Sequence, residues 1–246
     1  MLPLAMFRLT SFTAANGISF CMFAGLFGAL FLMSQFFQTA QGRTPLVAGA
    51  ELLVWSATGV FVAPVAGRLA ARHGNRPFML TGMVMQAAGL ACIAFSAHGN
   101  TPFLELAPML TFSSVGTSMV FPTVANEVMG SVAPEQAGIA SGTNSALREL
   151  GGVFGVAVLA SVFTRPGVYS SPDTFVAGFR SALWIAAAFS AIGVLLALLL
   201  KKTPHQAVPA GLATPRHPHT RQATSIGTPG NGTSAMAAPR AEPTRD

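Results

Sequence analysis

Ionisable side chains are distributed unevenly along this chain of 246 residues, and several long stretches contain none of them. No Asp, Glu, Lys, Arg or His lies between Arg8 and Arg43, and another free stretch covers residues 181–200. An α-helix that crosses the roughly 30 Å hydrocarbon core of a bilayer needs about 20 predominantly apolar residues. With their flanking residues, the free stretches therefore predict six membrane-spanning helices, at residues 13–37, 46–67, 78–97, 103–125, 138–163 and 176–200.

The pattern inside these stretches argues against other apolar architectures. Strands of a membrane barrel alternate between polar and apolar residues, and helices of a soluble bundle carry a polar stripe at helical spacing. Neither pattern is present, and the first apolar stretch is longer than the core of a secretory signal peptide. We predict an all-α integral membrane protein, a bundle of six transmembrane helices that has the lipid bilayer as its surroundings.

The amino-acid composition argues against several classes of function. Charged residues make up only 9% of the chain, against roughly 25% in soluble domains, which argues against an ordinary soluble enzyme. The net charge of +6 does not indicate nucleic-acid binding, because the basic residues are not clustered on a soluble face. The two cysteines lie inside apolar stretches, and neither metal-ligand spacing nor a catalytic triad is recognisable. We expect no enzymatic activity, no metal and no bound cofactor.

The end of the chain differs from the rest in composition. Residues 1–202 are expected to form the transmembrane domain. Residues 203–246 are rich in Pro, Thr, Ala and Gly and show no apolar periodicity, so they cannot bury enough surface to offset the entropy lost on ordering. We predict a disordered tail there.

The basic residues also predict an orientation, because Lys and Arg are in excess on the cytoplasmic side of membrane proteins. Six spans place both chain ends on one side. That side carries Arg8, Arg68, Arg72, Arg76, Lys201 and Lys202, and the opposite side carries Arg43, Arg165 and Arg180. We expect both termini to be cytoplasmic in a multi-pass protein of a bacterial plasma membrane.

Two adjacent charges interrupt the fifth predicted span. Its ion-free stretch, residues 150–164, covers only about 22 Å at 1.5 Å per residue, so Arg148 and Glu149 must lie inside the membrane. Neighbouring residues on a helix do not face each other, and each should find a separate partner in the bundle or a water-filled cavity. A structural or gating role is the leading interpretation; direct contact with substrate or protons, and snorkelling to the interface, are the alternatives.

Other polar residues are weaker candidates. Glu51 lies at or just inside the outer boundary, where it could carry protons or simply be a solvated interfacial carboxylate. Amide side chains could line a cavity or form interhelical hydrogen bonds; these are Asn16, Gln35, Gln38 and Gln86. Two pairs of glycines spaced by four, Gly138/Gly142 and Gly151/Gly155, indicate close helix packing within the bundle or at a homodimer face.

The segment between the second and third spans resembles a known motif. Residues 64–77 contain Gly67, Arg68, Arg72, Gly74 and Arg76, and they are similar to the glycine- and arginine-rich cytoplasmic loop of the major facilitator superfamily, G-x-L-a-D-R-x-G-R-[KR]. Glycines permit a tight turn between helices, and arginines meet helix ends or carboxylates at the membrane face. Ala71 stands where the family usually has Asp.

An ordered series of further segments extends this resemblance over residues 2–200. The segments are 35–38, 42–49, 121–126, 138–144 and 147–157. Together they look like the C-terminal six helices of the fourteen-helix drug:proton antiporters. The resemblance implies efflux of small lipophilic or cationic compounds by alternating access, with the proton gradient as energy source.

The resemblance covers only one half of such a transporter. It implies that activity requires a separate N-terminal half or a second copy of the chain. The alternative function is a non-transporting, truncated membrane protein or a membrane domain that binds partners.

Overall fold

The computed structural model describes residues 4–99, 101–164 and 172–200. The described residues form six long α-helices: α1 (Thr10–Gln35), α2 (Pro45–His73), α3 (Asn75–Ser96), α4 (Phe103–Gly130), α5 (Ala137–Phe163) and α6 (Pro172–Leu199). Each is long and apolar enough to cross a membrane, which confirms the predicted fold class. The predicted tail at 203–246 lies outside the described residues.

Three short elements complete the described structure. They are the 3-10 helices η1 (Leu4–Arg8) and η3 (Pro134–Gln136) and the π-helical segment η2 (Phe36–Ala40), which continues α1. Helices α2, α4 and the α1–η2 unit extend beyond the predicted spans. For α2 and α4 the reason is that gaps between charges mark only the part of a helix that lies in hydrocarbon, whereas the helix itself continues into the polar region.

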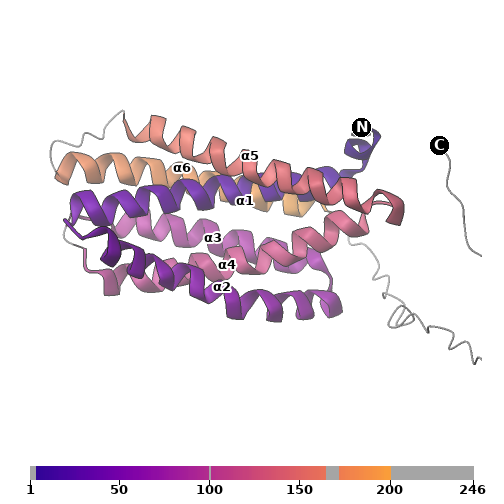
Figure 1. Cartoon of the computed structure of the whole chain (residues 1–246), viewed down its shortest axis with the longest axis horizontal. Coiled ribbons are helices and arrows are strands. Elements are labelled where there is room, and N and C mark those ends of the chain that lie inside the picture. Colours follow the sequence, from indigo (N-terminus) through magenta and orange to yellow (C-terminus); the bar gives the residue numbers. More distant parts are fainter. Residues whose placement is uncertain (1–3, 100, 165–171, 201–246) are drawn as a thin grey trace, which may run out of the picture. The chain divides into compact units, whose positions relative to one another are not determined.

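The helices run alternately in opposite directions (Figure 1). The start of α1, the α2–α3 turn, the α4–α5 connection and the end of α6 lie at the same end of the bundle. Helix α1 packs on α5 and α6, α3 packs on α4 and α6, and α2 packs mainly on α4. The most apolar stretch of α1 is 61% buried, against 18% in α2 and 28% in α5, so α1 is central and α2 and α5 each keep a face uncovered.

Glycines bring the backbones of α1 and α5 into close contact. A Cβ atom at Gly155 would overlap the backbone of Ala24, and one at Gly151 would overlap the backbone of Phe20. Gly28 faces the backbone of Gly155 from the other side. The pair Gly151/Gly155 therefore packs α5 against α1 within the bundle. At Gly138 and Gly142, by contrast, a Cβ atom would have no neighbour within 4 Å.

Polar side chains also join the helices. Asn144 of α5 donates from Nδ2 to Asn16 Oδ1 at 3.1 Å and to Ser19 Oγ at 2.8 Å on α1. Gln86 of α3 donates to the carbonyl oxygen of Met22 at 3.0 Å. Hydrogen bonds of this kind between membrane helices contribute roughly 0.6 kcal/mol on average, up to about 1.7 kcal/mol.

The α1–α5 contact can be tested with a single methyl group. We expect Gly155→Ala to lower the free energy of unfolding by about 1–3 kcal/mol, because backbone atoms of Ala24 cannot move aside as a flexible side chain would. Thermal unfolding in detergent would be followed by the reaction of the buried Cys21 with a thiol-specific dye. The exposed Cys92 would be replaced by Ser in all variants.

Gly142→Ala is the matched control on the same helix. Its methyl group would enter open space, so we expect unchanged or slightly raised stability, consistent with the better helix propensity of Ala. Equal unfolding temperatures for the two variants would contradict the proposed backbone contact.

Candidate functional site

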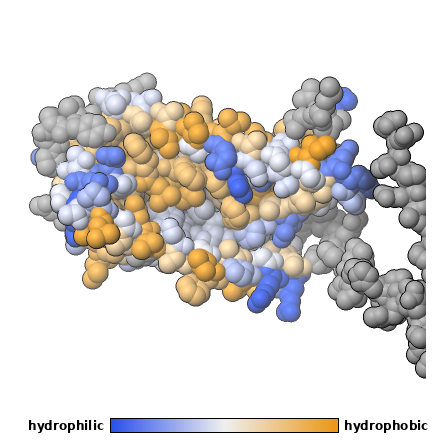
Figure 2. Space-filling view, viewed as in Figure 1, coloured by the Kyte–Doolittle hydropathy of each residue, from blue (hydrophilic) through white to orange (hydrophobic). Residues whose placement is uncertain are grey.

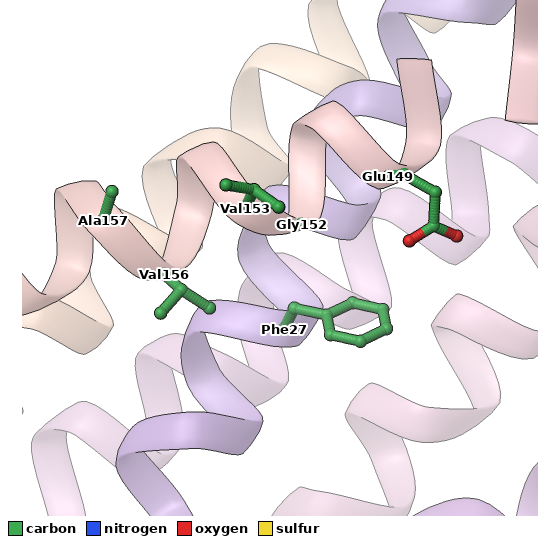
Figure 3. A pocket seen from close by; sticks show the side chains of 6 residues that line it. All are labelled: Phe27, Glu149, Gly152, Val153, Val156 and Ala157. Atoms are coloured by element: carbon green, nitrogen blue, oxygen red, sulfur yellow. The ribbon is translucent and has the colours of Figure 1, made fainter. Parts of the chain in front are cut away.

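A cavity of about 470 Å³ opens between α1 and α5 (Figure 3). Its lining residues are Phe27 from α1 and Glu149, Gly152, Val153, Val156 and Ala157 from α5. The volume falls within the roughly 300–1,000 Å³ of typical small-molecule sites. Figure 3 shows the Glu149 carboxylate of α5 directed toward the space beside the Phe27 ring of α1, with Gly152 on the next turn of α5.

Glu149 supplies the only charge among the residues that line this cavity. It lies twelve positions after the start of α5, about 18 Å along the axis and therefore near the middle of the helix. The side chain is exposed, and Figure 2 shows a hydrophilic spot over the α1/α5 region that borders hydrophobic surface. A carboxylate beside an aromatic ring and valines can bind a proton or the charged group of a lipophilic cation.

Arg148 points to different surroundings from Glu149. Its guanidinium carbon lies 5.0 Å from the centre of the Phe23 ring of α1 and 4.8 Å from that of the Phe121 ring of α4. A charge near the centre of a membrane helix costs roughly 2.5–3.5 kcal/mol on insertion scales. Each cation–π contact offsets about 0.5–2 kcal/mol of that cost. Arg148 thereby bridges α5 to both α1 and α4.

The predicted amide candidates do not line the large cavity. Asn16 is buried; besides accepting from Asn144, it donates from Nδ2 to the carbonyl oxygen of Phe12 at 2.9 Å. Gln38 donates to the carbonyl oxygen and the hydroxyl of Ser34, at 3.1 and 2.9 Å, within the α1–η2 unit. Gln35 is half-buried and absent from the lining of both cavities that we describe. The hydrogen-bonding alternative describes Asn16 and Gln38 better than the cavity alternative.

Glu51 is buried, with 8% of its surface exposed, so it is not the solvated interfacial carboxylate of the simpler sequence interpretation. Its Oε1 lies 3.2 Å from Nη1 of Arg43, in the segment between η2 and α2. Its Oε2 has no hydrogen-bond partner among the described residues. Glu51 is therefore held in place by a partly exposed arginine, at the opposite end of α2 from the glycine- and arginine-rich motif.

That motif forms a sharp turn between two helices rather than a loop. Gly67, Arg68 and Arg72 belong to α2, and Gly74 alone separates α2 from α3, with φ +89°. Only glycine adopts such a backbone without strain. Arg76, in the first turn of α3, donates to the carbonyl oxygen of Leu198 at 2.9 Å and so covers the end of α6.

A second contact at this end involves the residue before Arg76. Asn75 donates from Nδ2 to Oε2 of Glu127, at 3.0 Å, and joins α3 to the last turn of α4. Arg68 and Arg72 remain exposed. An amide thus contacts the α4 carboxylate in this chain, which has Ala71 where the motif usually carries Asp.

Three aromatic residues of the site were not singled out from the sequence as site residues. Phe23 and Phe27 are four residues apart on α1 and their rings stack, with centres 5.4 Å apart; Phe121 lies across from them on α4. Spacing by four also occurs elsewhere among the 19 phenylalanines of this chain, for example between Phe175 and Phe179. Only the position of Arg148 and Glu149 on the facing helix distinguishes these rings.

The six apolar helices, with few charges and an open face, define a multi-pass membrane protein. Comparison with known families then identifies it more closely: the chain belongs to the Major Facilitator Superfamily, whose family model matches residues 16–236.

Several curated relatives are similar to this chain. It is 35% identical to the multidrug resistance protein Stp of Mycobacterium tuberculosis over 162 residues, which cover 66% of this chain and 30% of Stp. It is 31% identical to the multidrug efflux pump LfrA of Mycolicibacterium smegmatis, covering 67% of this chain and 32% of LfrA. It is 29% identical to the methylenomycin A resistance protein of Streptomyces coelicolor, covering 66% of this chain and 34% of that protein. The matched region thus spans about a third of the length of these relatives.

The Arg43–Glu51 pair provides a test of how the buried carboxylate is held. We expect Arg43→Gln to lower the free energy of unfolding by about 1–2 kcal/mol, because it leaves a buried charge unpaired. This value is below the full cost of breaking a buried pair, since the Arg43 side chain is 40% exposed and screened by solvent.

The double variant Arg43→Gln/Glu51→Gln removes both charges and should recover most of the loss. Thermal unfolding of the wild type, both single variants and the double variant would give the coupling energy between the two side chains. A coupling energy of zero would show that Arg43 does not stabilise the Glu51 carboxylate.

Proposed function

We propose that this chain is part of a transporter that exports small lipophilic or cationic compounds across a bacterial plasma membrane in exchange for protons. The observation that carries the proposal is the cavity between α1 and α5, in which a lone carboxylate lies beside an aromatic ring in the middle of a membrane helix. Family membership and the names of three relatives, which denote drug or antibiotic resistance or efflux, support it.

One carboxylate suffices to couple the export of the compound to the entry of protons. Glu149 can hold a proton or face a cationic compound, and the two ligands compete because each neutralises the same charge. If the cavity is open to the cytoplasm in one state and to the outside in another, protons entering from outside release the compound there. Linkage makes this competition reciprocal, so a proton gradient can drive export. No covalent bond is formed or broken, which distinguishes the proposed activity from that of an enzyme.

The exposed faces of the bundle favour the presence of a second helical domain packed beside this one. Helix α2 exposes large apolar side chains that suit lipid, such as Leu53, Val60 and Phe61. The first half of α5 instead exposes mainly small and polar residues, which are Gly138, Ser141, Gly142, Ser145, Ala146 and Glu149, beside the larger Ile139 and Leu150. We propose that another helical body completes the α5 face, supplied by the rest of a longer protein, by a separate chain or by a second copy.

The orientation follows the positive-inside rule as part of the same proposal. The end of the bundle that carries Arg68, Arg72 and Arg76 would face the cytoplasm, together with the start of α1 and the end of α6. The Arg43–Glu51 pair would then lie on the outer side.

Binding of a fluorescent lipophilic cation such as ethidium tests the role of Glu149. We expect the wild-type chain in lipid nanodiscs to bind the cation, because the carboxylate attracts its positive charge. Glu149→Gln should weaken binding about tenfold at neutral pH, which corresponds to about 1.4 kcal/mol, because it removes that negative charge. Fluorescence titration at neutral pH measures the effect.

Glu135→Gln is the matched control, because Glu135 is exposed in η3, outside α5 and the cavity. Unchanged binding in Glu149→Gln would refute the assignment of the carboxylate. Dye uptake into everted vesicles under an imposed pH gradient then separates transport from binding. Cation binding without gradient-driven uptake would favour the alternative of a non-transporting membrane domain.

A further inference from the structure

A second, smaller cavity lies between α4 and α5. Its volume is about 80 Å³, room for roughly two or three water molecules at about 30 Å³ each. Ser141, Ser145 and Arg148 line it from α5, where a spacing of four and then three residues places them on one face of the helix. Apolar residues of α4, including Val128 and Met129, form the facing wall.

Three of the four polar side chains that line this cavity make no hydrogen bond to a described residue. Arg148 donates no hydrogen bond to any described residue, and its Nε is buried without a partner. The hydroxyl groups of Ser141 and Ser145 likewise make no hydrogen bond within the described part of the chain. Asn144, which also lines the cavity, already donates both amide protons to Asn16 and Ser19. The free donors therefore belong to Arg148 and the two serines.

The positive charge is also uncompensated. No Asp or Glu lines the cavity, and the one ion pair found within the described ranges is that of Arg43 and Glu51. The adjacent Glu149 lines the other cavity and forms no ion pair with Arg148. The Phe23 and Phe121 rings contact the guanidinium of Arg148. An aromatic ring has no oxygen or nitrogen lone pair, however, so its contact leaves the guanidinium N–H groups without a conventional hydrogen-bond acceptor.

We propose that the α4–α5 cavity binds one carboxylate-sized anion, held by Arg148 and the hydroxyls of Ser141 and Ser145. A guanidinium is suited to a carboxylate because its N–H donors form a planar fork. The ligand is either a free small anion or a carboxylate side chain from another polypeptide segment. The site does not depend on transport, so its test and that of the Glu149 pocket can fail separately.

Acetate is the probe for a free anion, and gluconate, with the same charge and functional group, is too large for the cavity. The unfolding temperature of the full chain in nanodiscs would be measured in each salt at constant ionic strength. Binding of acetate to the folded state alone should raise the unfolding temperature by about 4 °C when the acetate concentration is ten times the dissociation constant. Arg148→Gln should abolish the difference between the salts, and Ser145→Ala should reduce it. Arg68→Gln, at an exposed arginine, should leave it unchanged.

A zero-length carbodiimide cross-linker is the probe for a polypeptide carboxylate. Arg148→Lys places a reactive amine at the same position, and mass spectrometry would identify an Asp or Glu joined to position 148. In that case the cavity is already filled, and acetate should not stabilise the wild type. An acetate effect of equal size in Arg148→Gln would overturn the proposal. So would the absence of both an acetate effect and a cross-link.

Discussion

The close contact between the backbones of α1 and α5 determines the arrangement of the candidate site. Because Gly151 and Gly155 have no side chains, α5 lies directly against the main chain of Phe20 and Ala24. This contact fixes which side of α5 faces α1, and it therefore sets the direction of every other α5 side chain. Glu149 lines the cavity between the two helices, and Arg148 reaches the rings of α1 and α4.

The two Arg–Glu combinations of the described chain differ in whether they form an ion pair. Arg43 and Glu51 are eight positions apart and form an ion pair, which neutralises both charges at one end of the bundle. Arg148 and Glu149 are adjacent and do not pair, so each keeps its charge for a different cavity. A neutralised pair has little electrostatic attraction left for a ligand. The unpaired charges are the ones that can bind mobile ions, which is why the candidate sites lie on α5.

The six helices could be predicted from the sequence because lipid imposes a simple rule on where charges occur. The ends of α2 and α4 could not, since helices continue past the hydrocarbon into water. Of the site, Arg148 and Glu149 were found from the shortness of one apolar stretch. The partners Phe23, Phe27 and Phe121 depend on tertiary packing, and nothing in their local sequence separates them from other apolar helix residues.

The two cavities are coupled if both proposed ligands bind, because residues 148 and 149 are neighbours. An anion beside Arg148 cancels the positive charge next to Glu149, so a cation or a proton binds the carboxylate more tightly. Reciprocity of linkage then requires that a cation in the larger cavity strengthens anion binding in the smaller one. Since α5 packs closely on α1 but only lightly on α4, the bridge from Arg148 to Phe121 is the contact that an anion would affect most directly. Ion binding at Arg148 and Glu149 would therefore influence both the affinity for the compound and the packing of α4 against α5.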